Sequence, residues 1–197
     1  MALSYLLGSV PTGLWLGLRL RNVDIREHGS KNIGATNTVR VLGKKLGVVA
    51  LVCDMAKGFI PVSLMAWADV WQHAPLLCGI AAITGHTASM FLKFRGGKGV
   101  ATSAGVFLGF CPVPTVMAAV VFAVVAGSSR MVSAGSIVAA VSFAVMIYLL
   151  PEDWITPYRV NNLWLLRSMA TLVAVLILVR HRTNIKRIIA GNENKLW

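Results

Sequence analysis

Positive charge in this 197-residue chain is confined to short stretches that alternate with long apolar ones. Of the nineteen Lys and Arg residues, all but Lys57, Arg159 and Arg167 lie in four places, namely Arg19–Lys45, Lys93–Lys98, Arg130 and Arg180–Lys195. Together with a hydrophobic content of 56%, this pattern indicates an integral membrane protein. Because Lys and Arg are retained in cytoplasmic loops, the net charge of +12 belongs to one face of a membrane. Nucleic acid is therefore not expected as a partner.

The apolar stretches predict an all-α protein, a single domain over residues 1–197, and most approach the roughly 20 residues that cross a 30 Å hydrocarbon core. The exception is Val100–Ala126, which Cys111 and Pro112 interrupt. One kinked helix there would give six spans and would separate the basic loops onto two faces. Two short helices in a hairpin, the fourth and fifth, give seven spans and place every basic cluster on one side. We therefore predict seven transmembrane helices, with the N-terminus outside and the C-terminus cytoplasmic. The expected apolar spans are Ala2–Leu18, Leu46–Ala68, Leu76–Leu92, Val100–Phe110, Val113–Ala126, Val132–Leu150 and Leu163–Val179.

The first basic loop combines glycines and short polar side chains with positive charge. Such a loop lets backbone N–H groups converge on the oxygens of a phosphate. A solvated basic loop that meets anionic lipid headgroups is an equally open interpretation. The candidate oxyanion ligands are Ser30, Asn32, Gly34, Thr36, Asn37 and Arg40.

The second basic loop reads Phe-Arg-Gly-Gly-Lys-Gly-Val-Ala-Thr over Phe94–Thr102. It is not a Walker A motif, because Gly99 follows Lys98 and no glycine stands at the required distance upstream. It does place glycines and a lysine directly before a helix expected to begin near Val100. The N–H groups and positive dipole end of a helix start favour an anion. We interpret Gly96, Gly97, Lys98 and Gly99 as a phosphate site.

Two further polar clusters are predicted on the same face. Ser133 and Ser136 open the sixth span, where serines can also act simply as helix caps. His181 and Asn184 close the seventh span and share one side of a helix.

Ionisable residues also lie within the predicted spans, and three of them are near the candidate loops or in the quoted motifs. His86 is interpreted as a buried histidine rather than a catalytic base. Asp54 and Lys57, three residues apart, are interpreted as a structural ion pair that borders the site. The chain has no spaced set of His and Cys ligands and no nucleotide motif, so we expect neither a metal nor a cofactor.

Taken together, these segments resemble the bacterial acyl-phosphate:glycerol-3-phosphate acyltransferase (PlsY) family of integral membrane enzymes. The resemblance covers nearly the whole chain. Lys31 departs from it, since glycine is more often expected at that position. The segments that carry the resemblance are Tyr5–Pro11, Gly29–Asn37, Asp54–Gly58, Gly85–His86, Phe94–Thr102, Val132–Ser136 and Arg180–Arg187.

The resemblance implies transfer of a fatty acyl group from acyl phosphate to the 1-hydroxyl of glycerol 3-phosphate, giving lysophosphatidic acid and inorganic phosphate. This reaction starts phospholipid synthesis at the cytoplasmic face of the bacterial inner membrane. The implied partners are the two substrates, membrane lipid and the soluble enzyme that makes acyl phosphate. A transporter of a phosphorylated solute is the main alternative, because discontinuous helices also build transporter sites. A membrane scaffold is a third.

Individual roles follow from the same resemblance. Ser30, Asn32, Gly34, Thr36 and Asn37 would cradle the acyl phosphate. Glycerol 3-phosphate would be held by Arg40, Lys98, Ser136, His181 and Asn184. Of the residues with expected roles, the catalytic ones are Lys98, His181 and Ser136, and Ser133, Gly96, Gly97 and Gly99 add to the substrate-binding set.

The expected reaction needs no acyl-enzyme. No G-x-S-x-G motif is present, and no histidine is followed by the Asp of the common His-x4-Asp acyltransferases. Direct attack by the substrate hydroxyl is the simpler route. Either the departing phosphate or His181 would take the proton.

Overall fold

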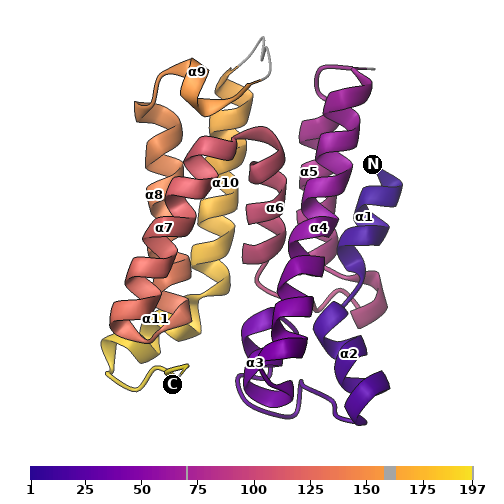
Figure 1. Ribbon diagram of the computed structural model, residues 1–197, viewed down its shortest axis with the longest axis vertical. Helices are drawn as coiled ribbons and strands as arrows, with labels where there is room; N and C mark the ends of the chain where they lie inside the picture. The colour runs from indigo at the N-terminus through magenta and orange to yellow at the C-terminus, as the bar shows by residue number, and fades with distance from the viewer. Residues whose placement is uncertain (70, 158–162, 197) are drawn as a thin grey trace. The chain divides into compact units, whose positions relative to one another are not determined.

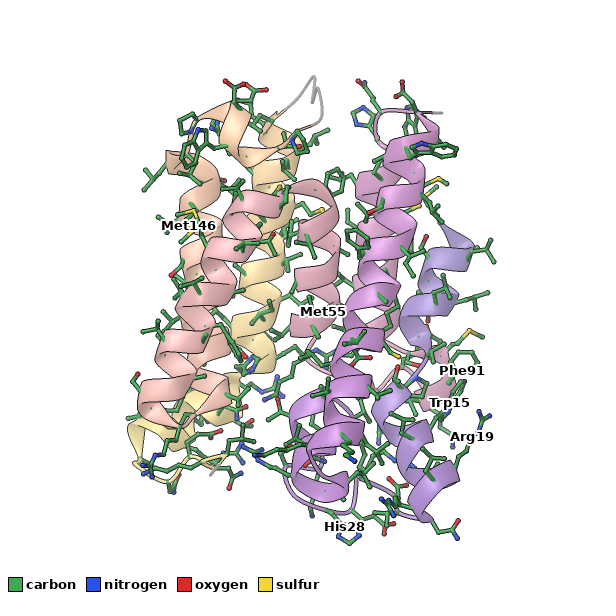
Figure 2. The ribbon with its side chains drawn as sticks, in the orientation of Figure 1. Trp15, Arg19, His28, Met55, Phe91 and Met146 are labelled. Atoms are coloured by element: carbon green, nitrogen blue, oxygen red, sulfur yellow. The ribbon has the colours of Figure 1, made fainter. Side chains whose placement is uncertain are left out.

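The structure is a computed structural model that describes residues 1–69, 71–157 and 163–196, and all regular elements in these ranges are helices. Arg159, one of the three isolated basic residues, lies outside the described residues. The chain divides into two compact units, Met1–Gly109 and Phe110–Trp197. Figure 1 shows the helices of both units.

The first unit holds a short bundle of helices with polar loops at one end. In Figure 1, α1 and α2 follow one another beside α4, and α3 lies where α4 begins. Its elements are α1 (Ala2–Ser9), α2 (Thr12–Arg21), α3 (Ala35–Leu42), α4 (Lys44–Ala68), α5 (Ala74–Thr87), the 3-10 turn η1 (Met90–Leu92) and α6 (Val100–Phe110).

The second unit is built on three long helices that pack side by side. Helix α8 contacts both α7 and α10, and α11 leads away from the end of α10 (Figure 1). Phe143 and Ile147 of α8 and Leu166 and Met169 of α10 are buried. The elements are α7 (Pro112–Ser129), α8 (Val132–Leu149), α9 (Glu152–Ile155), α10 (Leu163–Arg180) and α11 (Arg182–Ile189).

The helix lengths agree with an integral membrane protein. Five helical segments of the described chain are long and apolar enough to cross a membrane: Lys44–Ala68, Ala74–Leu92, Pro112–Ser129, Val132–Leu149 and Leu163–Arg180. They match five of the seven predicted spans. The all-α membrane class is thus confirmed, whereas the count of seven and the orientation of the termini stay predictions.

The chain around Cys111 forms two helices and not one kinked helix, as predicted. Helix α6 ends at Phe110 and α7 begins at Pro112. Proline suits the first turn of a helix, because it has no N–H to leave unpaired there. α7 runs on to Ser129, three residues beyond the expected end at Ala126.

The first expected span, Ala2–Leu18, is not one continuous helix. Helix α1 ends at Ser9 and α2 begins at Thr12, with Val10 in an extended conformation (φ −59°, ψ 114°). Pro11 has no backbone N–H, and its ring disfavours the helical conformation for the residue before it. The span is therefore broken at Val10 and Pro11.

Glycines bring helices of the first unit into backbone contact. Gly8 of α1 lies against the Ala82 carbonyl group of α5, and Gly85 of α5 lies against the Tyr5 carbonyl group of α1, so a Cβ atom at either glycine would collide. The Tyr5 hydroxyl donates a hydrogen bond to the Ala88 carbonyl oxygen at 2.9 Å. Small residues at helix interfaces are the usual means of tight packing in membranes, where the lipid is as apolar as the side chains.

Candidate active site

The first basic loop is organised by Asn37, the third residue of α3. Its amide nitrogen donates to the Ile25 carbonyl oxygen at 2.7 Å and to the His28 carbonyl oxygen at 3.2 Å. Its amide oxygen accepts the Ser30 N–H at 2.8 Å. Asn37 is only 1% exposed. The contacts of this predicted phosphate ligand hold the loop in shape, and a direct contact with substrate stays a prediction.

The rest of the loop leads into the start of α3. The Asn32 side chain accepts the Gly34 N–H at 2.9 Å, which shapes the turn before the helix. Thr36 and Arg40 lie on α3 and are half-buried. The first N–H groups of a helix have no acceptor in a preceding turn, so the start of α3 after Gly34 is where N–H donors are expected for the predicted oxyanion site.

Lys31 occupies a backbone conformation that favours glycine. Its φ angle is 58°, in the left-handed region. A side chain with a Cβ atom is disfavoured there by roughly 1–2 kcal/mol. This conformation gives a physical reason for the expectation of glycine at this position.

The glycine-rich loop is fastened to the end of α5. The Gly96 N–H donates to the Thr87 carbonyl oxygen at 3.1 Å, and the Gly97 N–H donates to the His86 carbonyl oxygen at 3.0 Å. Gly97 also lies directly against the His86 ring. His86 is buried and in contact with its neighbours, in agreement with its interpretation as a packed histidine.

Lys98 lies between this fastened segment and helix α6. Gly97 and Gly99 on either side are buried, and Lys98 itself is half-buried. Gly99 has a φ angle of 83°, which only glycine adopts readily, and α6 begins at the next residue. The predicted order of glycines, lysine and helix start is confirmed.

In the second unit, the carboxylate of Glu193, which was not predicted as a site residue, forms hydrogen bonds with two of the predicted residues. Glu193 Oε1 accepts hydrogen bonds from Ser133 Oγ at 2.9 Å and from Asn184 Nδ2 at 2.7 Å. Its other oxygen pairs with Arg187 Nε at 2.9 Å. Glu193 is the only acidic residue within the basic stretch Arg180–Lys195, and that exception was the available signal.

The hydrogen bonds also set the charge state of this carboxyl. Burial by itself would raise the pKa of Glu193, but the hydrogen bonds from Asn184, Ser133 and Arg187 outweigh it and lower the pKa. Glu193 is therefore ionised at neutral pH and helps to balance the positive charge of the tail.

Glu193→Gln is expected to loosen this cluster. The amide loses the negative charge and turns an N–H donor towards Arg187, and a hydrogen bond to a charged group contributes about 1.5–3 kcal/mol. We expect a lower midpoint of thermal unfolding in detergent at pH 7. The pKa of Glu193 is lowered on folding, so its stabilisation is complete above its ordinary value of 4.5 and is lost as the pH falls below it. The unfolding midpoint of the Glu193→Gln variant should therefore fall less than that of the wild type when the pH is lowered.

The matched control is Glu152→Gln, which changes an exposed glutamate of the same unit. Its unfolding midpoint should stay at the wild-type value. If Glu193→Gln and Glu152→Gln unfold alike at every pH, the cluster around Glu193 does not stabilise the unit.

His181 and Ser136 are also buried in the second unit. His181 Nδ1 lies 2.8 Å from the Ile177 carbonyl oxygen. A carbonyl oxygen only accepts, so Nδ1 carries the proton and Nε2 is the nitrogen that can take one. The Ser136 hydroxyl donates to the Val132 carbonyl oxygen at 2.9 Å, one turn back along α8.

The structure thus brings the predicted residues together in groups. Ser30, Asn32, Gly34 and Asn37 share one hydrogen-bonded loop, and Gly96–Gly99 share another. Ser133 and Asn184 share the carboxylate of Glu193. Among the described residues, no group of three or more His, Cys, Asp or Glu side chains is placed to hold a metal ion.

A family model described as glycerol-3-phosphate acyltransferase matches residues 1–191. The chain belongs to the glycerol-3-phosphate acyltransferase family. A family member from Fusobacterium nucleatum subsp. nucleatum is 42% identical over 195 residues, which cover 99% of this chain and 95% of that protein. One from Geobacter sulfurreducens is 41% identical over 98% of this chain and 94% of that protein.

Solved structures of the family agree with the fold. The crystal structure of PlsY (YgiH), an integral membrane glycerol 3-phosphate acyltransferase, in its glycerol 3-phosphate form is 34% identical. It matches 98% of this chain and 92% of that chain with a TM-score of 0.87. The lysophosphatidic acid form has a TM-score of 0.84 over 98% and 91%. The resemblance drawn from the sequence motifs is confirmed, and with it the class of integral membrane acyltransferase.

Proposed function

We propose that the chain transfers a fatty acyl group from acyl phosphate to the 1-hydroxyl of glycerol 3-phosphate, releasing lysophosphatidic acid and inorganic phosphate. The observation that carries this proposal is that this chain, which belongs to the acyltransferase family, has two glycine-rich loops that each lead into a helix start, an arrangement that suits a phosphate. They are the Gly29–Asn37 loop, which includes the first turn of α3, and the Gly96–Gly99 segment before α6. A related structure with glycerol 3-phosphate and one with lysophosphatidic acid support the acceptor and the product.

The residues of each loop have distinct proposed roles. The Gly29–Asn37 loop, with Ser30, Asn32, Gly34 and Thr36, binds the phosphate of the acyl donor, and Asn37 holds its shape. Lys98, with Arg40, neutralises charge on a substrate phosphate. In the second unit, Ser136, His181 and Asn184 bind glycerol 3-phosphate, and the contacts of Asn184 and Ser133 with Glu193 keep them in place.

The proposed chemistry is a single displacement. The oxygen of the 1-hydroxyl attacks the acyl carbonyl carbon, and the bond from that carbon to the phosphate oxygen breaks. The departing phosphate takes the hydroxyl proton, or His181 takes it at Nε2. An acyl phosphate is a mixed anhydride with a good leaving group, so positioning and charge neutralisation supply most of the acceleration.

The decisive assay gives detergent-purified protein palmitoyl phosphate and glycerol 3-phosphate, with a chelator present throughout. We expect phosphate release and lysophosphatidic acid in equal amounts. Palmitoyl-CoA in place of palmitoyl phosphate should give little product. Phosphate release without lysophosphatidic acid, or equal use of the thioester, would contradict the proposal. Uptake of glycerol 3-phosphate into proteoliposomes without a donor would favour the transporter alternative.

The proposed location is the bacterial inner membrane, with the loops on the cytoplasmic side. There the soluble enzyme that makes acyl phosphate supplies the donor. The reason is the charge pattern, since basic loops are retained in the cytoplasm. Single-cysteine labelling in a variant without Cys53, Cys78 and Cys111 tests it. A cysteine at position 31 should be protected from an impermeant reagent in whole cells and labelled after permeabilisation. Labelling in whole cells would reverse the orientation.

A further inference from the structure

The break between α1 and α2 leaves carbonyl groups outside the helical hydrogen-bond pattern. The Val10 carbonyl oxygen accepts the Thr12 N–H at 3.0 Å, and other parts of the first unit supply further donors at the break. Val10 does not continue α1, and Pro11 has no N–H. In a hydrocarbon environment each unpaired backbone group is costly, so a broken helix persists only where other groups complete its hydrogen bonds. The Ser9 carbonyl oxygen accepts the Ser89 hydroxyl at 2.5 Å, and the Val10 carbonyl oxygen accepts Lys57 Nζ at 2.9 Å.

Lys57 reaches this carbonyl from inside the long helix α4. Its side chain is 6% exposed and forms an ion pair with Asp54, 3% exposed, at 2.7 Å. The pair is the structural ion pair expected from the sequence. The ion pair with Asp54 is enough to balance the charge of Lys57. The hydrogen bond from Lys57 to the Val10 carbonyl oxygen is therefore a separate contact, which joins α4 to the break between α1 and α2.

The break in turn determines where α2 lies, and the phosphate loop rests on α2. Gly13 of α2 is in close contact with the Ile33 carbonyl oxygen and the Thr38 side chain, and a Cβ atom there would collide with both. Leu14, Ile25 and Ile33 form one buried cluster beneath the loop. A shift of α2 would therefore move the loop that contains Ser30 and Asn37.

We propose that Lys57 is a positioning residue for the acyltransferase reaction: it clamps the Val10 carbonyl and so fixes α2 and the Gly29–Asn37 loop on it. Asp54, 2.7 Å from Lys57 Nζ, holds the ammonium group beside the carbonyl. In this proposal the Asp54–Lys57 ion pair positions the break between α1 and α2 in addition to balancing its own charge. The kinetic part of the inference rests on the proposed function, whereas its structural part does not.

The test separates clamping from charge cancellation by removing both charges at once. Asp54→Leu/Lys57→Met is neutral and close in volume, and replacing a buried ion pair in this way is often harmless to stability. With only the Thr12 N–H left on the Val10 carbonyl, and no contact from α4, amide hydrogen exchange in α2 and the Ser30–Asn37 loop should rise about 10- to 100-fold. Exchange in α7 should not change. Ser89→Ala, which removes the neutral donor to Ser9, should raise exchange in the same segment by about 3- to 10-fold.

Kinetics of the same double variant give the second readout. A displaced loop should raise the KM for palmitoyl phosphate about 10- to 100-fold while kcat at saturation changes only a few-fold. Wild-type exchange rates in the double variant, or an equal rise in α2 and α7, would overturn the clamp. If wild-type protein does not use acyl phosphate, the proposed function fails, and the exchange measurement still decides the clamp.

Discussion

Replacing Lys98 with alanine is expected to lower kcat/KM by about 10- to 100-fold. The residue lies between two buried glycines at the start of α6, where its ammonium and the N–H groups of the helix start favour a phosphate. A charge-assisted hydrogen bond contributes roughly 1.5–3 kcal/mol, and each 1.4 kcal/mol is a factor of ten in rate. Steady-state kinetics with each substrate varied in turn would show which phosphate loses affinity.

Two further variants give this prediction its controls. Lys98→Arg should not restore full activity, because the planar guanidinium has a different shape and the loop is packed against α5 at Gly97. Lys93→Ala removes an exposed charge from the same loop outside the glycine motif and should leave turnover near normal. Wild-type turnover by folded Lys98→Ala and Lys93→Ala proteins would make the loop a membrane-surface anchor rather than part of a site.

Gly96→Ala is expected to lower kcat/KM roughly 100-fold or more. The new methyl group would collide with the backbone of His86 and Thr87 at the end of α5, and that backbone cannot move aside cheaply. Overpacking costs about 1–3 kcal/mol, and detaching the loop also breaks the hydrogen bonds of Gly96 and Gly97. The phosphate donors would then no longer be held before α6.

The matched control for this variant is Gly127→Ala in α7. No atom lies within contact distance of a Cβ atom there, and alanine is the better helix former by about 1 kcal/mol. Gly127→Ala should keep full activity and unfold at the same or a higher temperature. Gly96→Ala protein with wild-type kcat/KM would show that the fastening of the loop to α5 is dispensable.

Charge and apolar length predict most of the helices, because crossing a bilayer restricts both. The break at Val10 and Pro11 was missed because the span was assigned from its apolar length alone, although Pro11 itself signals it. The additional partners of these carbonyl groups, Lys57 of α4 and Ser89 in the connection after α5, are distant in the sequence and cannot be predicted from local spacing.

The sequence indicated the loops of the candidate site, but it did not indicate the residues whose hydrogen bonds hold those loops and side chains in place. Glycines before a helix indicate a phosphate site from sequence alone, and the structure has them in that order. Asn37 shows the limit of prediction from residue type. An amide side chain can bind substrate or can form hydrogen bonds within its own loop, and only the geometry of the turn distinguishes these two roles. Glu193 was missed because a single acid within a basic tail contributes little to a charge pattern.

The shortness of α6 affects how membrane thickness acts on this protein. Eleven residues of helix rise about 16 Å, roughly half of a 30 Å hydrocarbon layer. A helix of this length cannot match the height of neighbours such as α4, with 25 residues. No residue of α6 is exposed, so this short helix is covered by protein and does not itself have to match the thickness of the bilayer. Membrane thickness therefore acts on the longer helices such as α4, and it reaches the short helix and the loop before it only through them.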